Sequence, residues 1–211
     1  MPAQRSGWTF ALVASIGWFA LIAQYIIMLQ NRTVSPFLTT IRFFSFFTIL
    51  TNLLLAAYCT FMFLRRPKNV YIFFERPGVL TAITIYMLVV GSVYQLVLRP
   101  VWDPQGLQKW VDELLHSVQP VLGLIAWFLH EQKQGVRKAP FLQWLIYPLV
   151  YLVWILFVGA LSGFYPYPFV NVPQLGYGKV FLHCGAVVLL FLLLMLIFRT
   201  LAGMFKKEPW K

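Results

Sequence analysis

Six stretches of about 20 mostly apolar residues follow one another along this chain, and only short loops separate them. Each stretch is long enough for a helix to cross a hydrocarbon core of about 30 Å. The loops leave no room for a separate soluble domain, so we expect residues 1–211 to form a single all-α domain, a polytopic bundle of six transmembrane helices. The expected spans are Trp8–Leu29, Phe43–Leu64, Val79–Leu98, Trp110–Leu129, Phe141–Leu161 and Val180–Leu201.

The composition is also that of a membrane protein. Hydrophobic residues make up 60% of the chain and charged residues 11%, against about 45–50% and about 25% in soluble domains. The net charge is +11, but the basic residues lie mainly between the apolar stretches, so they suit membrane topology and anionic lipid headgroups rather than nucleic acid. Cys59 and Cys184 lie inside apolar stretches, where we expect small buried side chains rather than a disulfide.

The distribution of Lys and Arg predicts how the chain is oriented. With six spans, the two termini and the second and fourth loops share one side, which carries twelve basic residues against five on the other side. The positive-inside rule therefore places both termini in the cytoplasm. The inner group is Arg5, Arg65, Arg66, Lys68, Arg76, Lys133, Arg137, Lys138, Arg199, Lys206, Lys207 and Lys211, and the outer group is Arg32, Arg42, Arg99, Lys109 and Lys179.

Polar side chains inside the spans fall at similar depths. The second, fourth and sixth spans run inward, and at 1.5 Å per residue Thr48, His116 and His183 lie roughly 5–9 Å below the outer boundary. Polar residues within a membrane usually face the bundle interior or a water-filled cavity. We therefore expect a polar pocket in the outer half of the bundle. The residues about one turn above or below this depth are Asp112, Glu113, Thr51 and Asn52.

The longest outer loop, Ser162–Lys179, reads SGFYPYPFVNVPQLGYGK and is rich in aromatic residues and proline. Aromatic residues concentrate at membrane interfaces, so the loop can serve as an interfacial anchor. The alternative is a lid over a cavity between the helices. In that case Tyr167 and Asn171 are its candidate pocket residues.

A hydroxyl beside an imidazole is the minimum for nucleophilic acyl transfer. Here Thr48 would be the nucleophile and His116 the base, while Asp112, four residues earlier on the same helix face, would orient the imidazole. Each residue also has a simpler interpretation. A threonine in a membrane helix commonly bonds a carbonyl of the preceding turn, a histidine can make one interhelical hydrogen bond, and an acid can stabilise a helix N-terminus.

Metal or haem ligation is the rival chemistry. His116 and His183 lie at similar depth and could be the two axial ligands of a haem b. A zinc site could add Asp112 or Glu113. With three histidines in the chain, we expect no metal site and keep a non-enzymatic lipid- or haem-binding membrane protein as the second hypothesis.

Three motifs together carry a family resemblance. The segments FSFFTILTNLLLA, DELLHSVQP and YPLVYLVWILFVGALSGFYPYPFVNV resemble the bacterial six-helix Pr-six-Pr family of membrane proteins. That family is distantly similar to the eukaryotic androgen-induced integral membrane proteins. The resemblance implies a threonine hydrolase that cleaves fatty acid esters of hydroxy fatty acids, with Thr48 and His116 as the matching catalytic residues.

The chain departs from the eukaryotic pattern at three places. Pro120 follows His116 by four residues where the relatives are expected to have five, and His183 has no counterpart. Thr51 and Asn52 replace an acidic neighbourhood, which leaves Thr51 as a second candidate nucleophile.

The leading hypothesis is a multi-pass protein of the bacterial inner membrane that hydrolyses lipid esters from the bilayer without a cofactor. Thr48 and His116 are the expected catalytic pair. The expected supporting residues are Asp112, Asn52, Thr51 and Glu113, and the expected pocket residues are His183, Tyr167 and Asn171.

Overall fold

The computed structural model describes residues 3–64 and 73–205, and every element within these ranges is helical. The helical fold expected from the sequence is therefore confirmed. The elements are α1 (Ala3–Gln30), α2 (Pro36–Phe43), α3 (Phe47–Leu64), α4 (Val79–Val93), η1 (Tyr94–Leu98), α5 (Leu107–Glu113), η2 (Leu114–Val118), α6 (Gln119–His130), α7 (Lys133–Val136), η3 (Phe141–Leu145), α8 (Ile146–Ser162), η4 (Pro168–Val170) and α9 (Val172–Met204).

Five helices of the described chain are long and apolar enough to cross a membrane. They are Gly7–Gln30, Phe47–Leu64, Val79–Leu98, Phe141–Ser162 and Val172–Met204. The remaining expected span corresponds to Leu107–His130, where the π-helical η2 joins α5 to α6. This segment is helical throughout, but it carries polar and charged side chains such as Lys109, Asp112 and Glu113, so it is less apolar than the other five.

The second and sixth expected spans begin at other residues than predicted, for reasons that the structure shows. The second span was expected to begin at Phe43, but Phe43 ends the separate helix α2 and α3 begins only at Phe47. The separate helix forms because Ser35 caps it, accepting from the N–H of Leu38, and Pro36 occupies its first turn. The last helix begins at Val172, eight residues before the expected start, because the Asn171 side chain caps it.

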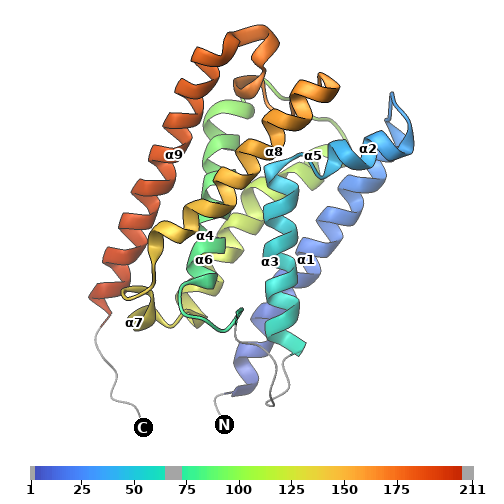
Figure 1. Cartoon of the computed structure of the whole chain (residues 1–211). Helices are drawn as coiled ribbons and strands as arrows, with labels where there is room; N and C mark the ends of the chain where they lie inside the picture. The colour runs from blue at the N-terminus through green and yellow to red at the C-terminus, as the bar shows by residue number, and fades with distance from the viewer. Residues whose placement is uncertain (1–2, 65–72, 206–211) are drawn as a thin grey trace.

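The helices form a bundle with α4 near its centre (Figure 1). Helix α1 packs against α3 and α6, and α4 packs against α3, α6 and α9. The described start of α1 and the described end of α9 lie at the same end of the bundle (Figure 1). The opposite end, which we call the α2 end, holds α2, the start of α5 and the loop of residues 163–171 (Figure 1).

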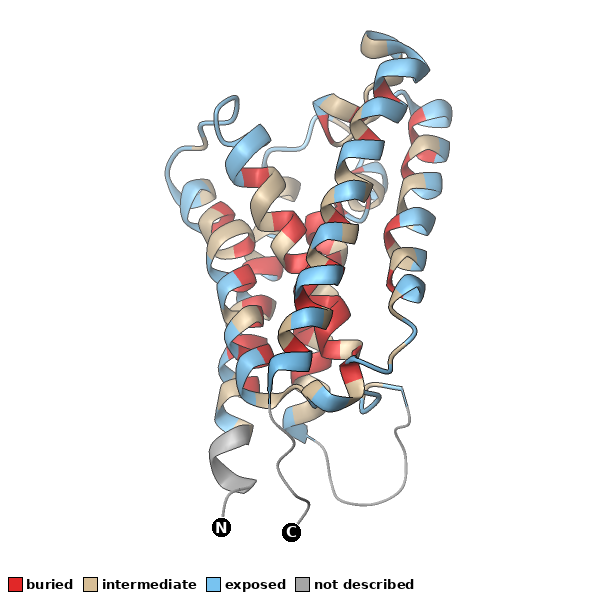
Figure 2. Ribbon diagram, turned by 90° about the vertical axis from the view of Figure 1, so that its left-hand side faces the viewer, coloured by how far each residue is buried: buried red, intermediate tan, exposed pale blue. Residues whose placement is uncertain are grey.

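Buried residues occupy the middle of the bundle, whereas the outward faces are exposed (Figure 2). Ile85 and Met87 of α4 are fully buried, but Leu161 on the outer side of α8 is 74% exposed. Many other large apolar side chains are exposed along α1, α8 and α9. Apolar surface this extensive is suited to contact with lipid. The structure thus supports a multi-pass membrane protein.

The loop of residues 163–171 folds back onto the bundle. Gly163 ends α8 with a φ of 70°, which a residue with a side chain adopts only at a cost. The ring of Tyr165 then lies against Gly159, at a place where an added Cβ would overlap it. The close contact explains the glycine at 159, as the positive φ explains the one at 163, and the loop that follows brings Tyr167 to α3.

The orientation expected from the basic residues stays a prediction. Those whose side chains fall outside the described part are Arg5, Arg65, Arg66, Lys68, Lys206, Lys207 and Lys211.

Candidate functional site

Thr48 and His116 meet at the α2 end of the bundle. The Thr48 Oγ1 atom lies 3.2 Å from His116 Nε2, across 68 residues of chain. Thr48 is the second residue of α3 and is only 6% exposed, while His116 is the middle residue of η2. The structure therefore joins the two residues that the depth argument and the family resemblance single out.

Asp112 holds the other side of the imidazole. His116 Nδ1 lies 2.9 Å from the backbone oxygen of Asp112 and 3.3 Å from its carboxylate Oδ1. A carbonyl and an ionised carboxylate can only accept a hydrogen bond, so Nδ1 carries the proton. Nε2 of the neutral ring is then left as an acceptor for the hydroxyl of Thr48. Both ring nitrogens thus have protein partners.

The π-helical turn frees a backbone carbonyl beside His116. The N–H of Gln119 donates to the carbonyl of Leu114, five residues back, and the next residue, Pro120, has no N–H. The carbonyl of Leu115 is consequently left without a backbone donor. Asn52 Nδ2 donates to it at 3.2 Å and also to the carbonyl of Thr48 at 2.9 Å. Asn52 thus ties the first turn of α3 to the turn that carries His116.

Tyr94 was not anticipated from the sequence, although it lies at the outer end of the third span. Its ring stacks on the imidazole of His116, with centroids 4.2 Å apart. Helix α4 approaches closely just before it, because a Cβ at Gly91 would lie 3.2 Å from the carbonyl oxygen of His116. The depth argument could have found Tyr94, had it been extended from polar residues to aromatic ones.

Tyr167 reaches Thr48 from the loop of residues 163–171. The N–H of Thr48 donates to the Tyr167 phenol oxygen at 3.3 Å, and that oxygen lies 3.5 Å from Thr48 Oγ1. Because Thr48 is in the first turn of α3, its N–H has no partner within the helix. Burial raises the pKa of Tyr167, although its hydrogen bonds with Thr48 oppose the shift. The phenol therefore stays protonated and can donate as well as accept.

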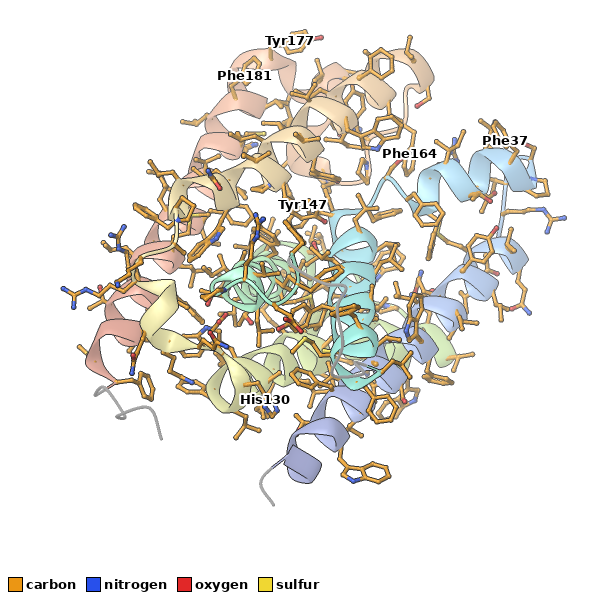
Figure 3. The ribbon with its side chains drawn as sticks, turned by 60° about the horizontal axis from the view of Figure 1, so that its bottom comes forward. Phe37, His130, Tyr147, Phe164, Tyr177 and Phe181 are labelled. Carbon is orange, nitrogen blue, oxygen red and sulfur yellow. The ribbon has the colours of Figure 1, made fainter. Side chains whose placement is uncertain are left out.

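Three expected site residues lie elsewhere. Glu113 pairs with Arg99 and accepts from the Ser117 hydroxyl at 2.6 Å, so it points away from the imidazole. The Thr51 hydroxyl lies 3.1 Å from the Tyr147 phenol rather than beside His116. Tyr147 lies inside the bundle beside α3 (Figure 3).

His183 also departs from its expected place, because it lines neither of the two cavities beside Thr48. Its Nδ1 lies 3.2 Å from the carbonyl oxygen of Phe169. Since Phe169 stacks on Tyr167, with centroids 5.2 Å apart, His183 supports the loop that carries Tyr167.

A cavity of about 770 Å³ opens above the pair at the α2 end. Thr48, His116, Asp112 and Tyr167 line it. Its other polar lining residues are Gln24, Asn31, Arg32, Thr33, Thr39, Arg42, Tyr94, Gln108, Tyr165, Asn171 and Gln174. The arrangement matches the expected polar pocket, and Asn171 lines it as anticipated. We call this space the wide cavity.

Comparison of the chain with protein-family models, with curated proteins and with solved structures finds no match. Within residues 3–64 and 73–205, no three His, Cys, Asp or Glu side chains gather as a metal site would require.

Proposed function

We propose that this protein is a membrane-embedded hydrolase of lipid esters, with Thr48 as the nucleophile and His116 as the general base. The observation that carries the proposal is the 3.2 Å contact between Thr48 Oγ1 and His116 Nε2, made while Asp112 holds Nδ1. Hydroxyl, base and orienting group thus stand in the order that acyl transfer requires. The resemblance to the membrane threonine hydrolases supports the same pair.

In the first half of the reaction, Thr48 Oγ1 attacks the ester carbonyl carbon while its proton passes to His116 Nε2. The imidazolium that forms is stabilised by the carboxylate and carbonyl of Asp112. When the tetrahedral intermediate breaks down, the ester C–O bond cleaves and Nε2 returns the proton to the leaving alkoxide. The alcohol departs, and the acyl group remains on Thr48.

In the second half, water attacks the acyl group and gives its proton to His116 Nε2. Collapse of this intermediate releases the carboxylic acid and restores the Thr48 hydroxyl with the proton from Nε2. Both intermediates carry an oxyanion next to Thr48 Oγ1. The Tyr167 phenol, 3.5 Å from that atom, is placed to donate to the oxyanion.

The proposed setting is the bacterial plasma membrane, crossed six times with both termini in the cytoplasm. Three observations support it: the described ends of α1 and α9 lie at the same end of the bundle (Figure 1), Leu107–His130 is helical throughout, and the basic residues are unevenly distributed. In this orientation the wide cavity faces the outer side.

The proposed substrate is a lipid ester that also carries an anionic group, as fatty acid esters of hydroxy fatty acids do. Arg42 and Arg32 line the wide cavity. The guanidinium of Arg42 lies 4.7 Å from the centroid of the Phe164 ring. Among the described residues, no carboxylate pairs with either arginine. A substrate carboxylate could therefore take that place.

Hydrolysis of fatty acyl esters by the purified protein in detergent tests the proposal. We expect activity in the wild type, no activity above background in Thr48→Ala, and a loss of roughly 10²–10⁴-fold in His116→Ala. Thr51→Ala is the matched control, because Thr51 lies one turn along α3 and bonds Tyr147 instead. Wild-type rates in Thr48→Ala or His116→Ala would refute the assignment.

A further inference from the structure

A second, narrower cavity lies on the other side of Thr48. Its volume is about 90 Å³, and α4, α8 and α9 form its walls. Thr48 and Tyr167 line this cavity as well as the wide one. The proposed nucleophile thus stands at the boundary between two spaces of different size. We call the smaller one the apolar crevice.

The walls of the apolar crevice suit a hydrocarbon chain. Representative lining residues are Val90, Leu149, Ile155, Val187 and Phe191. Among the residues that the structure describes, no charged side chain lines the crevice. The Tyr151 hydroxyl in its wall already donates to the carbonyl of Ser45 at 2.8 Å. A space with so few free polar groups is a poor site for water but a favourable one for methylene groups.

Aromatic side chains pack beside the crevice. The Phe47 ring of α3 contacts the rings of Tyr147 and Tyr151, with centroids 5.3 and 5.0 Å apart. Tyr86 of α4 contacts Tyr147 in the same way, at 4.8 Å. These wide rings lie between α8 and the helices α3 and α4, next to the crevice.

The crevice also reaches the outer surface of the bundle. Leu149 lines it and is 45% exposed, so the space extends to the apolar face of α8. On α9, Tyr177 and Phe181 also point outward, as Figure 3 shows, and both are more than half exposed. An opening on such a face would meet the hydrocarbon of the bilayer rather than water.

We propose that the apolar crevice binds one hydrocarbon chain of the substrate, which enters sideways from the bilayer. This inference rests on the proposed function and adds the substrate class, a chain-bearing amphiphile that spans both spaces. The ester lies at Thr48, between the chain in the crevice and the polar or charged remainder in the wide cavity. The crevice between α4, α8 and α9, and not the wide cavity, would then determine which lengths of substrate hydrocarbon chain are accepted.

A crevice-filling variant tests the selection of chain length. Val187→Trp should lower kcat/KM for a long-chain palmitoyl ester about tenfold or more relative to a short butyryl ester. Leu189→Trp is the matched control, because Leu189 lies two residues along α9 and is 67% exposed on the outer face. The control should keep the wild-type ratio. An unchanged ratio in a folded Val187→Trp protein would overturn the proposal.

Photocrosslinking tests the crevice without relying on hydrolysis or on a crowded core. The Thr48→Ala protein is incubated in detergent with a fatty acid that carries a diazirine near its methyl end, then irradiated and mapped by mass spectrometry. Adducts on crevice residues such as Val187 and Phe191, competed away by unlabelled palmitate, are expected. Adducts confined to outward residues such as Leu189 would mean ordinary lipid contact and would overturn the proposal.

The two proposals fail in different ways. If the wild-type protein hydrolyses no ester but crosslinks still form on crevice residues, the hydrolase proposal is wrong and the hydrocarbon-binding site in the crevice is supported. If esters are hydrolysed, but no crosslinks form on crevice residues and Val187→Trp does not change the preference for acyl chain length, the crevice proposal is wrong and the Thr48–His116 proposal is supported.

Discussion

The phenol ring of Tyr94 stacks on the imidazole of His116, with centroids 4.2 Å apart and ring planes 17° from parallel. Both residues belong to π-helical turns, Tyr94 as the first residue of η1 and His116 as the middle residue of η2. The stack fixes the plane of the imidazole, while the bonds to Asp112 fix its rotation within that plane. The ring is thus constrained in two independent ways.

Removing the stacked ring should therefore misalign the base. We expect Tyr94→Leu to lower kcat for ester hydrolysis by up to about a hundredfold, since small misplacements of reacting groups cost that much. Tyr94→Phe keeps the ring and should keep most of the activity. The comparison is made by steady-state kinetics on one fatty acyl ester. Equal rates in Tyr94→Leu and wild type would show that the stack does not position His116.

Asp112→Asn removes the carboxylate but leaves the backbone carbonyl that also accepts from His116 Nδ1. We expect kcat to fall less than the roughly 10⁴-fold loss found where a carboxylate alone holds the histidine tautomer. The remaining loss reports the weaker stabilisation of the imidazolium. A full 10⁴-fold loss, in a protein that still folds, would mean that the backbone carbonyl contributes nothing to the tautomer.

Tyr167→Phe removes the donor nearest to the expected oxyanion and keeps the ring that packs on Phe169. We expect kcat to fall about 10²-fold with little change in KM, because the lost hydrogen bond matters most in the transition state. Tyr177→Phe is the control, because Tyr177 is 57% exposed on α9 and lines neither cavity, and it should behave like wild type. A change in KM alone would assign Tyr167 to substrate binding instead.

Asn52 should matter for stability as well as for activity. Asn52→Leu leaves the carbonyl of Leu115 without its donor and removes the bond to the carbonyl of Thr48. We expect the free energy of unfolding to fall by about 1–3 kcal/mol. Thermal unfolding in detergent measures the change, with Thr200→Ala as the control because Thr200 makes only a local bond on the surface of α9. Equal stability of the two variants would show that the Asn52 hydrogen bonds between α3 and η2 do not stabilise the fold.

Arg42 should distinguish anionic from neutral esters. Arg42→Gln is expected to raise KM for an ester that carries a carboxylate about tenfold and to leave KM for a neutral ester nearly unchanged. Lys179→Gln removes the same charge from an exposed site outside both cavities, and it should change neither value. If Arg42→Gln and Lys179→Gln change KM alike, the effect comes from the net charge of the protein and not from the cavity.

The sequence predicts the features of this fold that follow from helices crossing a membrane. Apolar length places helices along nearly all of the expected spans, and a helix that crosses a membrane fixes the depth of each residue it carries. That is why Thr48 and His116 can be paired from depth alone, although 68 residues separate them. Glu113 could not be excluded in this way, because depth gives no information about which face of a helix a residue occupies.

The remaining features depend on single hydrogen bonds or on tertiary packing. A π turn differs from an α turn by one residue in bonding register, and no residue pattern marks η1 or η2. Tyr167 reaches Thr48 because its loop folds back over Gly159. No sequence pattern predicts this contact, since Thr48 and Tyr167 lie 119 residues apart. The break between α2 and α3 lies at Phe44, Ser45 and Phe46, and in the sequence the two phenylalanines resemble the continuation of an apolar span.

The π turn at η2 makes the contact between Thr48 and His116 depend on the number of residues in this helix. The helix from Leu107 to His130 contains one residue more than an unbroken α-helix would need at this turn. Deleting Val118 would restore the α-helical register and rotate His116 relative to α6 by about 100°. Such a chain would keep its apolar helices, its threonine and its histidine, yet the two side chains would no longer face each other. A change of one residue in the length of this turn would therefore disrupt the proposed pair, even where every residue of the pair is kept.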